Sequence, residues 1–66
     1  MSTLDDLAAR LDQLAEDLAD AAIDALRDAL DAGEDKPELE RRLTRARRSV
    51  ERAAALVRGR TALDDD

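Results

Sequence analysis

The leucine spacing of the first thirty residues constrains this chain most. Leucines stand at positions 4, 7, 11, 14 and 18, in alternating steps of three and four. This spacing places them on one side of an α-helix and is typical of coiled coils. Ile23, Leu26 and Leu30 continue the pattern further round the helix, so the apolar arc covers about half of the circumference. The pattern predicts a helix over about residues 3–32 that can contact more than one neighbour.

The segment from Gly33 to Pro37 is the one clear break in the pattern. Gly33 suits the left-handed residue that follows many helices. A second helix can start in one of two ways: with Asp35 as N-cap and Glu38 three residues later, or with Lys36 as cap and Pro37 in the first helical position. A connection of about three to five residues forces the next helix back alongside the first.

A second apolar stripe follows the break, in steps of four and three. It consists of Leu39, Leu43, Ala46, Val50, Ala53 and Val57. We therefore predict an all-α fold, an antiparallel two-helix hairpin, with the turn at 33–36, the second helix at about 37–58 and a flexible acidic tail at 59–66. Folding the chain at this turn pairs Leu30 with Leu39 and Leu26 with Leu43, and small residues at several other contacts allow a close approach.

A hairpin of 66 residues has a marginal core, because each helix buries only one stripe. The wide arc of the first helix offers what a second copy needs, so we expect a homodimer that forms a four-helix bundle. A lone hairpin and a complex with a larger protein are the alternatives. The residues expected at the interface are Leu4, Leu7, Leu11, Leu14, Leu18, Ile23, Leu26, Leu30, Leu39, Leu43, Val50 and Val57.

Charge divides the chain into an acidic first part and a basic second part. The net charge is −6, but residues 1–35 carry −9 and residues 36–60 carry +6. Arg41, Arg45, Arg48 and Arg52 form a basic ridge, a candidate site for nucleic acid phosphates or an acidic protein. An ordinary solvated face is the simpler interpretation. The chain lacks aromatic residues for stacking on bases, and its overall charge repels phosphates, so nucleic acid is the less favoured partner.

The composition also points away from catalysis and from membranes. Histidine and cysteine are absent, and the carboxylates fall on outward-facing positions, so we expect no catalytic residue, no metal site, no cofactor and no enzyme activity. No apolar run approaches the roughly 20 residues of a membrane span. The acidic start does not resemble a signal peptide, which predicts a cytoplasmic location. Ten arginines against one lysine, with fourteen alanines, suggest a GC-rich bacterial genome.

The layout of two helices, a short turn and a polar tail resembles the Rop-type plasmid regulators. The resemblance covers most of the chain and implies a hairpin that dimerises into a four-helix bundle. That family binds RNA hairpins through a central aromatic residue and polar and basic residues of its first helix. Here the first helix is acidic and has no aromatic residue, so RNA binding is not implied. The sequence therefore favours a small non-catalytic protein-interaction or regulatory module that acts through packing of helix faces.

Overall fold

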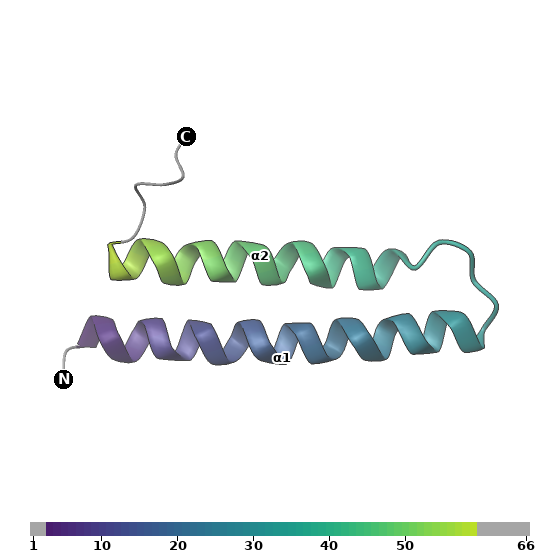
Figure 1. The fold of residues 1–66 in the computed structure, drawn as a ribbon, viewed down its shortest axis with the longest axis horizontal. Coiled ribbons are helices and arrows are strands. Elements are labelled where there is room, and N and C mark those ends of the chain that lie inside the picture. The colour runs from purple at the N-terminus through teal and green to yellow at the C-terminus, as the bar shows by residue number, and fades with distance from the viewer. Residues whose placement is uncertain (1–2, 60–66) are drawn as a thin grey trace.

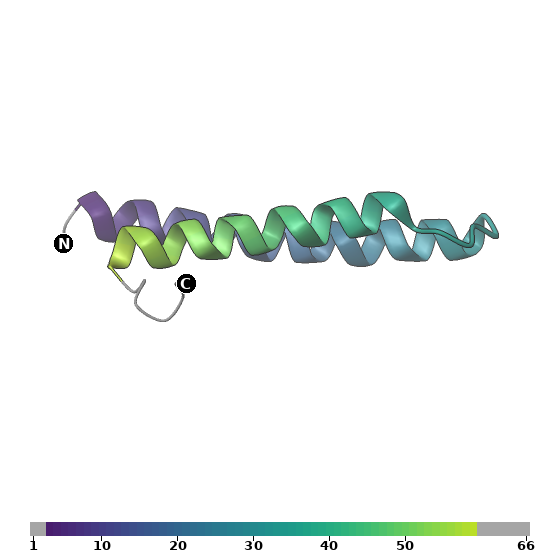
Figure 2. The same ribbon diagram turned by 90° about the horizontal axis from the view of Figure 1, so that it is seen from above.

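The chain folds into two antiparallel α-helices joined by one connection. The computed structural model describes residues 3–59, with α1 at Thr3–Asp31 and α2 at Glu38–Arg58. The helices lie side by side along their length, and α2 ends near the start of α1 (Figure 1). Viewed from above, they cross at a shallow angle (Figure 2). The all-α hairpin predicted from the heptad pattern is confirmed, whereas the predicted acidic tail from residue 60 onward lies outside the described residues.

Gly33 ends α1 as the sequence suggests. Its φ of +74° lies in the left-handed region, which glycine adopts without a steric penalty. The amide of Glu34 donates to the carbonyl of Ala29 at 2.8 Å, and the amide of Gly33 donates to the carbonyl of Leu30 at 3.0 Å. These two hydrogen bonds are the Schellman arrangement, which satisfies carbonyls that the helix end leaves without partners.

The start of α2 differs from both predicted caps. Pro37, with ψ of 76°, occupies the N-cap position, and no side chain caps the helix. The first turn is closed by the amide of Arg41, which donates to the carbonyl of Pro37 at 3.1 Å. The predicted capping roles of Asp35 and Lys36 are therefore wrong. Six residues, 32–37, separate the two helices, so the connection is longer than the predicted four-residue turn.

The seam between the helices is built from alanine. The buried residues of the described chain are Ala8, Ala15, Ala22 and Ala29 of α1, and Ala54 of α2. Those of α1 recur every seventh residue, which keeps them on the line of contact with a second helix. Alanine side chains let two helices approach closely, so the larger side chains fall on either side of the seam.

The predicted pairing of large side chains across the seam is wrong near the turn. Leu30 and Leu39 are 66% and 50% exposed, and Leu26 is also exposed. The rotation of the helices about their own axes accounts for this. Leu26 lines a hollow with Ile23 and Thr44, whereas Leu39 lines a different one with Ala25 and Asp28. The leucines of the two helices near the turn therefore lie on opposite sides of the alanine seam.

Candidate functional site

The leucines at positions 4–18 of α1 and the apolar stripe of α2 lie on the same broad side of the hairpin. The opposite side carries two hollows, one lined by Ala19, Leu26 and Thr44 and the other by Asp12 and Glu51. On each helix, the alanine seam separates the apolar stripe from the residues that line these hollows. We call this side the leucine face. It consists of Leu4, Leu7, Leu11, Leu14 and Leu18 of α1 and Leu39, Leu43, Ala46, Val50, Ala53 and Val57 of α2.

The leucine face leaves much of its aliphatic surface uncovered. Leu4, Leu7, Leu14 and Leu39 are exposed, Leu4 to 58%. Leu11, Leu18, Leu43 and the two valines are half-buried against the seam. A contiguous set of large exposed aliphatic side chains on a small chain marks an interaction surface or a site prone to aggregation, whereas single exposed leucines need no such explanation.

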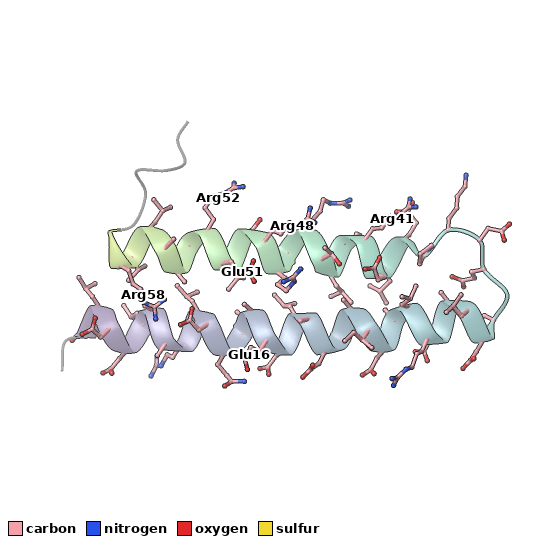
Figure 3. The ribbon with its side chains drawn as sticks, viewed as in Figure 1. Glu16, Arg41, Arg48, Glu51, Arg52 and Arg58 are labelled. Atoms are coloured by element: carbon pink, nitrogen blue, oxygen red, sulfur yellow. The ribbon has the colours of Figure 1, made fainter. Side chains whose placement is uncertain are left out.

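The opposite side carries a bidentate ion pair between the helices. Arg58 of α2 reaches toward α1 (Figure 3). Its Nη1 donates to Asp12 Oδ1 at 3.1 Å and its Nη2 donates to Oδ2 at 2.7 Å. These hydrogen bonds, together with the nearby negative charges, raise the pKa of the Arg58 guanidinium above its usual value. The pair shows which residues of the two helices lie level with each other.

More polar side chains occupy the same side nearer the middle of the hairpin. Arg47 is half-buried and its Nη1 lies 3.2 Å from Glu51 Oε2 within α2. Thr44 donates to Glu40 Oε2 at 2.9 Å. Arg47 and Glu51 line an open hollow of about 330 Å³ together with Asp12 and Glu16. We call this side the charged face, defined by Asp12, Glu16, Arg47, Glu51 and Arg58.

The structure divides the predicted interface residues between the two faces. Nine of the twelve lie on the leucine face. Ile23 and Leu26 instead line an open hollow of about 340 Å³ with Arg47 and Thr44, on the side of the charged face. Leu30 is four residues after Leu26 and seven after Ile23, so it belongs to the same side of α1. These three side chains form a smaller apolar patch near the turn.

The predicted basic ridge is fully open to solvent. Arg41, Arg45, Arg48 and Arg52 are all exposed. Arg41 and Arg52 point away from α1 (Figure 3), so the ridge lies along the outer side of α2. A shallow hollow is lined by Arg41, Arg45 and Arg48, with Glu40 and Thr44 beside them.

Within residues 3–59, no group of three or more His, Cys, Asp or Glu side chains is placed to hold a metal ion. Neither α1 nor α2 combines the length with the apolar character that a membrane-crossing helix needs.

Two features of these surfaces were missed by sequence reasoning. The first is the alanine seam, although its seven-residue repeat is visible at positions 8, 15, 22 and 29. The second is the pair between Arg58 and Asp12, which are 46 residues apart in the chain. No local pattern signals that pair, because it depends on the register of the two helices.

Comparison of the chain with protein-family models, curated proteins and solved structures gives no match. Function is therefore inferred from the residues and their geometry alone.

Proposed function

We propose that this protein is a small non-catalytic interaction module that binds a protein partner through its leucine face. The observation that carries the proposal is the uncovered aliphatic surface on one side of the hairpin, with Leu4, Leu7, Leu14 and Leu39 between 41% and 58% exposed. Burying such surface contributes roughly 25 cal/mol per Å². A helical partner fits best, because side chains at steps of three and four receive the apolar stripe of another helix.

The test is capture of partners by tagged protein from a lysate of the source cells. The wild type is compared with a Leu7→Gln/Leu14→Gln variant, which alters the leucine face. The matched control is Ile23→Gln/Leu30→Gln, which removes two exposed aliphatic side chains from the other side. We expect a specific protein to be retained by the wild type and the control and lost by the leucine-face variant. Equal retention by all three baits would contradict the proposal.

A second candidate function is association with nucleic acid through the basic ridge. The exposure of all four arginines, Arg41, Arg45, Arg48 and Arg52, favours it. The neighbouring α1 weighs against it, because its nine acidic and two basic side chains give a net charge of −7. A gel shift at low salt that disappears when the four arginines become glutamine would promote this candidate, since phosphate contacts are salt-dependent.

A further inference from the structure

We propose that the occupant of the leucine face is a second copy of this chain, oriented so that each α1 lies over the partner's α2. This inference rests on the proposed role of the leucine face and adds the identity and the orientation of the partner. It is carried by the charges beside that face.

The two helices carry opposite charge. Nine acidic and two basic residues give α1 a net charge of −7, and seven arginines with three glutamates give α2 a net charge of +4. Two hairpins can stack leucine face on leucine face about two different two-fold axes. An axis parallel to the helices places α1 over the partner's α2. An axis perpendicular to them places each helix over its own copy.

The acidic side chains that border the leucine face distinguish the two arrangements. Asp17 follows Leu14 by three residues and Asp24 follows Asp17 by seven, so both lie beside the leucine face on the outer edge of α1. Placing α1 over a second α1 brings two such acidic edges together. Like charges in contact disfavour that arrangement, and the same holds for two basic α2 helices.

Placing α1 over the partner's α2 brings the acidic edge of α1 beside a basic helix instead. A two-fold axis parallel to the helices gives α1 and the partner's α2 the register that α1 has with its own α2. The Asp12–Arg58 pair marks that register. Counting sixteen residues forward along α1 and sixteen back along α2 from this pair places Asp28 level with the partner's Arg42. Arg42 follows Leu39 by three residues, so it lies beside the leucine face on the outer edge of α2.

Asp28 and Arg42 are both exposed in the hairpin. Asp28 belongs to the seven-residue row that also holds Leu7, Leu14 and Ala21, and it lies near the turn with Pro37 and Leu39. Together with the acidic edge of α1, Arg42 selects the orientation of the second copy, while the leucine face supplies the buried surface.

Light scattering on the purified full chain tests the identity of the partner. We expect a molar mass of twice the 7.2 kDa of one chain. A monomeric mass would overturn the proposed second copy. Capture of another protein that depends on Leu7 and Leu14 would then still support the interaction module, so the two proposals fail separately.

Cross-linking tests the orientation. The chain contains no cysteine, so Asp28→Cys in one chain and Arg42→Cys in another supply unique thiols. Both sites are exposed, and circular dichroism checks that the helices persist. With a short bismaleimide we expect a covalent pair when the two variants are mixed, identified by its mass, and none from either variant alone. Cross-linking of the Asp28→Cys variant to itself would overturn the orientation, because it requires α1 beside α1. The absence of a covalent pair from the mixture would overturn it as well.

Discussion

The two broad faces of the hairpin border the same alanine seam and differ in what crosses it. On the charged face, Arg58 reaches from α2 to Asp12 and makes two hydrogen bonds across the seam. On the leucine face, the flanking positions of both helices are aliphatic, and several of these side chains remain exposed. A solvated ion pair needs no further partner, whereas exposed aliphatic surface gains free energy from any fitting cover. The difference indicates that one face completes the hairpin and the other is available for binding.

The largest expected effect comes from the seam that both faces share. Replacing Ala22 with leucine puts a large side chain where the residue is only 7% exposed and the helices are close. Overpacking of this kind costs about 1–3 kcal/mol, so the free energy of unfolding should fall by that amount in urea denaturation. Ala9→Leu is the control, because Ala9 is exposed on the same helix. Equal stability of the two variants would show that close contact of alanines does not set the distance between the helices.

A smaller effect should separate the two faces directly. Leu14 on the leucine face and Ile23 on the other side are 46% and 52% exposed, so they form a matched pair. Burial of a leucine contributes roughly 1.5–3 kcal/mol, and about 1.4 kcal/mol corresponds to a tenfold change in a dissociation constant. Leu14→Gln should therefore weaken self-association about tenfold or more in sedimentation equilibrium, while Ile23→Gln leaves it unchanged. The same weakening in both variants would mean that the faces do not differ in function.

The heptad pattern was enough to predict the hairpin but not the rotation of its helices. Leucines at 4, 7, 11, 14 and 18, with the break at Gly33, determine two helices that fold back on each other. The apolar arc of α1 is so wide that several rotations bury similar amounts of aliphatic surface. Ala15 and Ala22, and not the neighbouring leucines, occupy the seam because the two backbones approach closely there. The distance between the backbones depends on both helices together, so the sequence of one helix does not reveal it.

The register was closer to the prediction than the rotation. Pairing Leu30 with Leu39 places Asp12 level with Val57, one residue from Arg58, which Asp12 contacts in the structure. Both leucines are nevertheless exposed, because the rotation places them on opposite sides of the seam. The rotation also decides that Asp12 and Arg58 lie on the same side, which is why their ion pair could not be predicted.

The smallest expected effect concerns that ion pair. Arg58→Gln removes both hydrogen bonds to Asp12 but leaves an exposed side chain, so the midpoint of thermal unfolding should fall by less than in Ala22→Leu. Because the pKa of Arg58 is raised, its charge and its contribution persist below the usual arginine pKa, and the deficit should stay constant between about pH 7 and 9. Added salt should shrink the deficit by screening the pair.

Arg41→Gln is the control, since Arg41 is exposed and points away from α1. A deficit that is no larger for Arg58→Gln than for Arg41→Gln would show that the pair does not hold the charged face together, and the register would then depend on the alanine seam alone.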